Sequence, residues 1–81
     1  MCGITGIISA KNNHFLYSNK LKKMVNDINF RGPDDQGIWF NNKRNVYLAH
    51  ARLSILDLSK NGKQPMISSE GRFIIIFNGE I

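Results

Sequence analysis

The chain opens with the stretch that decides its fold, Met1-Cys2-Gly3-Ile4-Thr5-Gly6-Ile7-Ile8-Ser9. Its β-branched residues favour an extended backbone, and the Lys11-Asn12-Asn13 cluster that follows is typical of a loop. We therefore predict a strand from Gly3 to Ser9. The only cysteine of the chain, Cys2, stands directly before this strand.

A helical period follows the strand. Four apolar residues fall at the spacings i, i+3, i+4 and i+7, which mark one face of a helix: Leu21, Met24, Val25 and Ile28. We predict a helix near residues 18–30 with Ser18 as its N-cap, and we place His14 in the polar loop before it. Pro33 disfavours helical backbone at Gly32, so the helix is expected to have ended there.

The second half of the chain reads as strands joined by turns. Strands are predicted at residues 38–40, 46–50, 66–67 and 72–77. The segments between them are dense in turn formers and are predicted to be loops or hairpin turns: 31–37, 41–45, 60–65 and 69–71. Residues 51–58 alternate less cleanly and are predicted to be irregular or extended. A strand, a helix and then several strands with hairpin connections define an α+β arrangement.

The last predicted strand contains Phe73-Ile74-Ile75-Ile76-Phe77, which is apolar on both faces. This pattern is typical of a strand that is covered on both sides. Since the only helix in the sequence pattern can cover just one face of a sheet, we predict that a second sheet supplies the remaining cover.

Composition excludes several classes of protein. At 81 residues the chain makes at most one small domain, and it contains no apolar run of the roughly 18 residues that cross a bilayer. The net charge of +5 comes from short, scattered clusters without interleaved aromatic residues, so no nucleic-acid partner is expected. One cysteine and no signal-like start predict a cytoplasmic setting. The end at Phe77-Asn78-Gly79-Glu80-Ile81, without a polar tail, suggests a piece of a longer protein.

Cys2 can carry two reactive groups. Removal of Met1 would leave Cys2 as the mature N-terminus, with a thiol and a free α-amine on one residue. Near pH 7 an α-amine is a usable proton acceptor, and a nucleophile with its own base is a known arrangement for covalent catalysis. The alternative is a small, semi-apolar residue that enters a strand, as most lone cysteines are. Cys2 alone favours that alternative, so the decision depends on the rest of the chain.

Two further segments offer contacts for a ligand. Arg52 follows a strand between apolar neighbours, and its guanidinium can bind a carboxylate bidentately. The alternative is a pair with Asp57 or another surface acid. The side-chain amide of Asn78 and the backbone N–H of Gly79 give two donors at the exit of a strand, suitable for an oxyanion hole. Glu80 can hold a cationic amine. The alternative for this segment is an ordinary Asn-Gly turn.

Two other features compete for a chemical role. Arg31 with Asp34 and Asp35 can shape a pocket wall or bind a metal, but paired acids in a Gly-Pro turn are more often turn formers, so no metal is assigned. A Cys2–His50 dyad is the rival to the N-terminal amine as base. Because no third residue that would orient His50 is visible, the dyad ranks below the amine.

The ligand that fits all these groups together is an amino-acid amide, and glutamine fits best. The groups are a nucleophile, a base, oxyanion donors, a carboxylate-binding cation and an ammonium-binding acid.

Five segments carry a resemblance to a known family. They are Met1-Cys2-Gly3-Ile4 with Gly6, Arg31-Gly32-Pro33-Asp34 with Gly37, His50-Ala51-Arg52-Leu53-Ser54-Ile55-Leu56-Asp57, Gln64-Pro65-Met66 and Phe77-Asn78-Gly79-Glu80-Ile81. In this order and spacing the chain resembles, over all 81 residues, the glutamine amidotransferase domain of asparagine synthase (glutamine-hydrolysing). This is a class II, N-terminal-nucleophile domain. The second and third segments separate it from the sugar and phosphoribosyl amidotransferases.

The resemblance implies a role for each site residue. Cys2 would attack the side-chain amide of glutamine with its own α-amine as base, and Asn78 with the Gly79 N–H would hold the oxyanion. Arg52 would bind the substrate α-carboxylate, and Glu80 would bind its α-amine. Asn78 would also belong to the glutamine-binding residues. The backbone that would line the pocket belongs to Leu53, Ile55 and Leu56. A glutamyl thioester would form with release of ammonia, and water would then release glutamate.

The resemblance also implies a larger context. Residues 1–81 would be the N-terminal portion of a four-layer αββα sandwich. In the parent enzyme, a ligase that can form a homodimer, a C-terminal synthetase domain would use ATP and Mg²⁺ to amidate aspartate, while these 81 residues would need no cofactor or metal. Two alternatives stay open: an amidotransferase of this kind with another acceptor, and an inactive fragment or small basic binding module.

Overall fold

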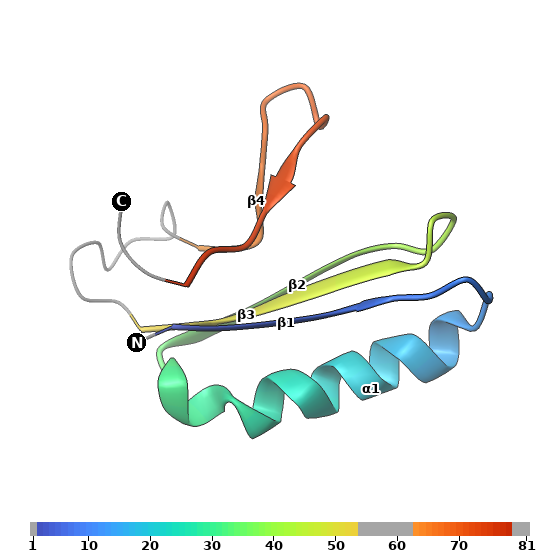
Figure 1. The fold of residues 1–81 in the computed structure, drawn as a ribbon. Coiled ribbons are helices and arrows are strands. Elements are labelled where there is room, and N and C mark those ends of the chain that lie inside the picture. Colours follow the sequence, from blue (N-terminus) through green and yellow to red (C-terminus); the bar gives the residue numbers. More distant parts are fainter. Residues whose placement is uncertain (1, 54–62, 79–81) are drawn as a thin grey trace.

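The computed structural model describes residues 2–53 and 63–78. Its elements are β1 (Gly3–Ile8), α1 (His14–Asp27), the 3-10 turn η1 (Asn29–Arg31), β2 (Asp35–Asn41), β3 (Val46–Arg52), β4 (Met66–Ile67) and β5 (Ile74–Ile75). Helix α1 runs along one face of a sheet, and the β4–β5 hairpin rises on the other side (Figure 1). This combination of a helix with antiparallel strands confirms the predicted α+β class.

Strand β3 is the centre of a three-stranded antiparallel sheet of order β1-β3-β2. In its register Gly3 lies opposite Ala51, and Gly37 lies opposite His50. Both neighbours continue the ladder beyond residue 50, which explains why β3 reaches Arg52 instead of ending at the predicted residue 50. For the same reason β2 begins at Asp35, before the predicted start at residue 38.

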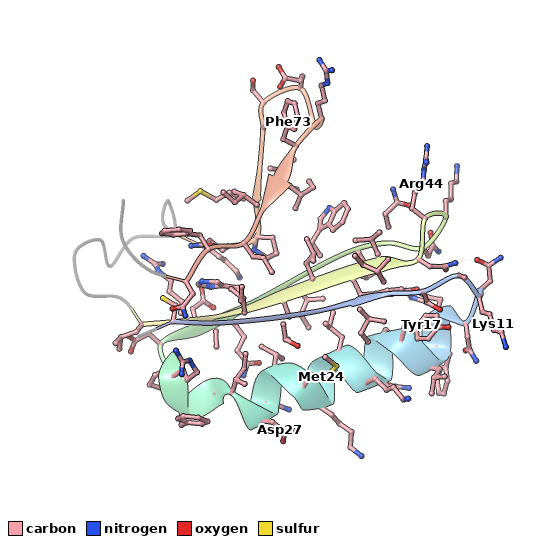
Figure 2. All side chains as sticks on the ribbon, viewed as in Figure 1. Lys11, Tyr17, Met24, Asp27, Arg44 and Phe73 are labelled. Carbon is pink, nitrogen blue, oxygen red and sulfur yellow. The ribbon has the colours of Figure 1, made fainter. Side chains whose placement is uncertain are left out.

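The core lies between this sheet and α1. Alternate residues of β3 point toward the helix and are buried there with two helix residues: Tyr47, Ala49, Ala51, Leu21 and Val25. Figure 2 shows Tyr17 and Met24 on the sheet side of α1 and Asp27 on the opposite side. The predicted apolar stripe is therefore confirmed, since Ile28 also packs against this cluster.

The predicted start of the helix is wrong. Asn13 is the N-cap, because its Oδ1 accepts a hydrogen bond from the Leu16 N–H at 3.1 Å. Ser18 lies inside α1, where its hydroxyl donates to the Phe15 carbonyl at 3.2 Å. His14 is the first helical residue, not a loop residue, and its Nδ1 lies 3.0 Å from the Tyr47 hydroxyl. No helix among the described residues is long and apolar enough to span a membrane.

The β4–β5 hairpin corrects the prediction for the last strand. The turn is where it was predicted: the Gly71 N–H donates to the Ser68 carbonyl at 2.8 Å, and Gly71 has a φ of 72°. Of the predicted strand 72–77, however, only Ile74–Ile75 pair with β4. Phe73 and Ile75 are 63% and 49% exposed. Within the described part of the chain this hairpin pairs only with itself. A second sheet is thus present opposite α1, but it is too small to bury its strand on both faces.

Candidate active site

Cys2 lies at the head of β1, beside the end of β3. Gly3 pairs with Ala51, so one step further along the antiparallel register brings Cys2 next to Arg52. The Cys2 Sγ accepts a hydrogen bond from the Leu53 N–H at 3.4 Å and lies 3.9 Å from the Leu53 carbonyl oxygen. The thiol is half-buried and is held by main-chain groups just beyond β3.

The 3-10 turn fixes the main chain of Cys2 from another side. The Arg31 Nε donates to the Cys2 carbonyl oxygen at 3.1 Å. Gly32 lets this turn approach β3 closely, because a Cβ on it would lie 2.4 Å from the Ala51 carbonyl carbon and oxygen. From the sequence, Arg31, Asp34 and Asp35 could be either a pocket wall or turn formers, and the contact of Arg31 with Cys2 was missed. No group of three His, Cys, Asp or Glu side chains within 2–53 and 63–78 can hold a metal ion.

Arg52 ends β3 and is only 7% exposed. It lies opposite Asp35 in the register with β2, and its carbonyl oxygen accepts the Asp34 N–H at 3.0 Å. Arg52 is therefore a buried residue next to Cys2 at the same end of the sheet. The alternative partner Asp57 lies outside the described residues.

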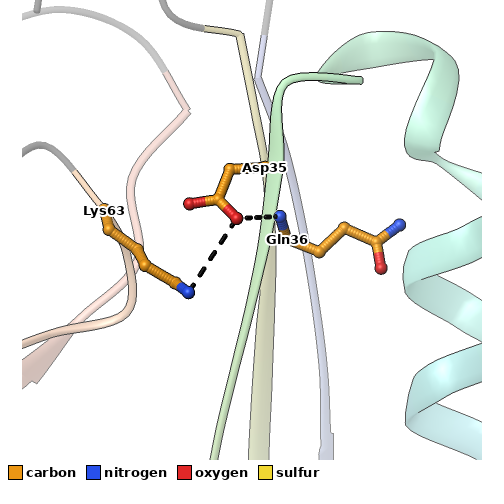
Figure 3. Close-up of polar contacts among 3 residues, drawn as sticks. All are labelled: Asp35, Gln36 and Lys63. Atoms are coloured by element: carbon orange, nitrogen blue, oxygen red, sulfur yellow. Dashed lines mark hydrogen bonds and ion pairs between the residues drawn. The ribbon is translucent and has the colours of Figure 1, made fainter. Parts of the chain in front are cut away.

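Asp35 links this end of the sheet to the segment that precedes β4. Its Oδ1 accepts the Gln36 N–H at 2.9 Å and lies 3.8 Å from the Lys63 Nζ (Figure 3). The Lys63 and Asp35 side chains are 50% and 35% exposed, so the ion pair contributes at most about 1 kcal/mol. Its significance is positional, because it places residue 63 against β2.

His50 is fully buried in β3, and its Nε2 lies 3.0 Å from the Phe77 carbonyl oxygen. Because a carbonyl oxygen only accepts, Nε2 carries a proton, while Nδ1 is buried without a hydrogen-bond partner among the described residues. Burial lowers the pKa of His50, against an opposing effect of the Phe77 hydrogen bond. The Cys2 Sγ contacts Leu53 and not this ring, which speaks against the rival Cys2–His50 dyad.

The lowered pKa of His50 predicts a pH dependence of stability. Between that lowered pKa and 6.5 the unfolded chain binds more protons than the folded chain. The contribution of neutral His50 to the free energy of unfolding is therefore fully present above pH 6.5. It is lost as the pH falls from 6.5 toward the lowered pKa. We expect hydrogen-exchange protection of the β3 amides, corrected for intrinsic rates, to decrease there. The variant His50→Gln keeps a side-chain N–H donor but does not titrate, and the same decrease in that variant would contradict the assignment.

Asn78 directly follows Phe77, whose carbonyl oxygen is hydrogen-bonded to His50. The Phe77 N–H donates to the Gln64 Oε1 at 2.5 Å, so both backbone polar groups of Phe77 are bound by side chains. The Asn78 residue itself is exposed. Nothing in the sequence pattern marked Gln64 for this contact. The other predicted site residues lie outside the described residues: Ile55, Leu56, Gly79 and Glu80.

The structure therefore brings three segments to one end of the sheet. Cys2 comes from the head of β1, Arg52 and Leu53 from the end of β3, and Asn78 from the segment after β5. A thiol, a buried cation and a side-chain amide are the groups expected of a site that attacks an amide carrying a carboxylate.

Comparison with known proteins identifies the family of the chain. The sequence matches the family described as "Glutamine amidotransferase domain" over residues 1–81. Because this match covers the whole chain, the chain belongs to the glutamine amidotransferase domain family. No solved structure matches it.

Among curated proteins, the chain is similar over its whole length to glutamine-hydrolyzing asparagine synthetases. It is 42% identical over 83 residues to asparagine synthetase (glutamine-hydrolyzing) 2 of Bacillus subtilis (strain 168), of which it covers 11%. It is 35% identical over 81 residues to asparagine synthetase B (glutamine-hydrolyzing) of Escherichia coli (strain K12), of which it covers 14%. It is also 34% identical over 90 residues to Amidase chry2 of Gibberella zeae, of which it covers 13%. The chain thus spans less than a fifth of the length of each of these relatives.

Proposed function

We propose that this chain supplies the glutamine-hydrolysing half-site of an amidotransferase, with Cys2 as the nucleophile. The observation that carries the proposal is the position of the Cys2 thiol, which is bound at the Leu53 main chain and adjacent to the buried Arg52. The family membership of residues 1–81 gives independent support for glutamine as the substrate.

The reaction begins when Cys2, as the mature N-terminus, transfers its thiol proton to its own α-amine. The sulfur attacks the side-chain amide carbon of glutamine, and a tetrahedral oxyanion forms that Asn78 and the Gly79 N–H bind. The C–N bond breaks as the α-ammonium of Cys2 gives the proton to the leaving nitrogen, so ammonia departs and a glutamyl thioester remains. Water then attacks the thioester, the C–S bond breaks, and glutamate and the free thiol are released.

The substrate is oriented by its α-amino-acid group. Arg52 binds the α-carboxylate, for which its fork of N–H donors is suited, and Glu80 binds the α-ammonium. The backbone of Leu53 lines the same pocket and also holds the thiol at 3.4 Å, so substrate and nucleophile share one support. Ile55 and Leu56 extend this lining, and no metal takes part.

The fold and the parent protein follow from the same proposal. The chain forms the first part of a four-layer αββα sandwich, whose remaining strands cover the open face of the β1-β3-β2 sheet. The whole protein is a ligase, able to form a homodimer, that passes ammonia to a synthetase domain where ATP and Mg²⁺ drive the amidation of aspartate to asparagine. The similarity to Amidase chry2 favours a second candidate, an amidotransferase of the same kind with another acceptor.

The test of the proposed function is glutamine hydrolysis by the intact protein. L-glutamine is expected to yield glutamate and ammonia in equal amounts, and D-glutamine, whose α-groups do not reach both clamps, is expected to yield neither. Glutamate can be measured by chromatography and ammonia by a coupled enzyme assay. Absence of glutamate from L-glutamine in folded protein would overturn the proposal.

A further inference from the structure

The Phe77 peptide is held on both sides by side chains from other segments. Its N–H donates to the Gln64 Oε1, and its carbonyl oxygen accepts the His50 Nε2–H. Backbone groups outside a strand ladder more often bind water or other backbone groups, so two side-chain partners on one residue restrict its position closely. The next residue along the chain is Asn78.

The two partners of Phe77 are themselves fixed by the sheet. His50 is fully buried in the central strand β3, and Gly37 lies opposite it in β2. A Cβ on Gly37 would lie 1.6 Å from the Gln64 carbonyl oxygen, so the main chain at Gln64 crosses directly over this glycine. The Lys63–Asp35 ion pair holds the preceding residue on the same strand. His50 and Gln64 are therefore both fixed by the β1-β3-β2 sheet when they bind Phe77.

The same sheet also holds the nucleophile, Cys2. Arg52, which lies beside Cys2, is two residues from His50 on β3, and Leu53 holds the Cys2 thiol. The distance between the thiol and Asn78 is thus set through one strand and one pair of side-chain hydrogen bonds. An oxyanion donor works only when it is held close to the place where the charge develops.

We propose that His50 and Gln64 are positioning residues, which hold the Phe77 peptide between them and thereby aim Asn78 at the oxyanion formed on Cys2. This inference rests on the proposed function and adds to it two residues that do not touch the substrate. His50 acts here as a neutral hydrogen-bond donor to Phe77 and not as the base for the thiol.

The test compares apolar and conservative variants at both positions in the intact protein. His50→Leu and Gln64→Leu each remove one bond to Phe77 and are expected to lower kcat for glutamine hydrolysis roughly 10- to 100-fold, because the oxyanion donor is misplaced. The KM for glutamine is expected to stay near its original value, since Arg52 is untouched. His50→Gln retains a donor and Gln64→Glu retains an acceptor, so both are expected to keep most of the kcat.

A second readout separates positioning from damage to the fold. The rate at which iodoacetamide alkylates the Cys2 thiol requires no oxyanion hole, so it is expected to be unchanged in all four variants. A kcat in folded His50→Leu and Gln64→Leu equal to that of the original protein would overturn the inference, as would a loss in which kcat and alkylation fall together. If His50 is instead the base, His50→Gln will be as inactive as His50→Leu. Gln64 is only half-buried, which keeps the test available if His50→Leu does not fold.

The outcome for the proposed function is read from Cys2→Ala, measured in the same assay. Hydrolysis that survives in Cys2→Ala would overturn the proposed function as a whole. Hydrolysis that is lost in Cys2→Ala but unchanged in the apolar variants of His50 and Gln64 would overturn only the positioning role.

Discussion

Replacing Cys2 by alanine is expected to lower glutamine hydrolysis by the intact protein roughly 10³-fold or more, because the residue that forms the covalent intermediate is lost. The structure gives the thiol a defined place, at 3.4 Å from the Leu53 N–H, and alanine leaves the backbone of that place unchanged. Glutamate release over time at saturating glutamine measures the effect.

Two comparisons sharpen this prediction. Cys2→Ser is the matched control, since serine is also small enough for Met1 to be removed and differs from cysteine by one atom; its hydroxyl is a poorer nucleophile, so little activity is expected. Formation of the amidated product from added ammonia should be unaffected in both variants, because it does not use the thiol. Equal loss of the glutamine-dependent and ammonia-dependent reactions would show that Cys2 supports the structure and not the chemistry.

Replacing Arg52 is expected to weaken the binding of glutamine. Hydrogen bonds to charged groups contribute about 1.5–3 kcal/mol, so Arg52→Gln is predicted to raise the KM for glutamine roughly 10- to 100-fold. Since the α-carboxylate is bound equally in the ground state and the transition state, kcat is expected to change less than KM. Steady-state kinetics over a wide range of glutamine concentrations measures both constants.

Arg52→Lys provides the matched control, because it keeps the charge but loses the planar fork that binds a carboxylate bidentately. Its KM is expected to lie between those of the original protein and Arg52→Gln. Arg52 is only 7% exposed, so the melting temperature of each variant must be measured beside its kinetics. An unchanged KM in folded Arg52→Gln would remove Arg52 from the substrate site.

The helix and the sheet were largely predictable because their signals are local. The apolar stripe of α1 was found from its period, β1 from its β-branched residues, and β3 and the hairpin turn at Gly71 from the turn formers around them. The helix start was missed because Asn13 and Ser18 are both good N-caps, and only the bond from the Leu16 N–H distinguishes them. The prediction of one long last strand was wrong because strand length depends on neighbouring strands, which the residue pattern does not reveal.

The sequence indicated residue types for the candidate site but not the contacts between them. Cys2, Arg52 and Asn78 were singled out from chemistry and resemblance, and the register of β1 with β3 brings the first two together. The bonds from Gln64 and His50 to Phe77 join residues 13 and 27 positions apart, and no spacing rule connects them. They depend on the crossing of the chain over Gly37, which only the three-dimensional structure reveals.

The most direct test of the central claim is the mass of the N-terminal peptide, isolated by acid quench from protein that is hydrolysing glutamine. We expect a peptide that begins at Cys2, of which a fraction carries one glutamyl group on the sulfur, and no glutamyl group on the peptide of Cys2→Ala. A fully active protein whose N-terminal peptide retains Met1, or a glutamyl group on another residue, would contradict it.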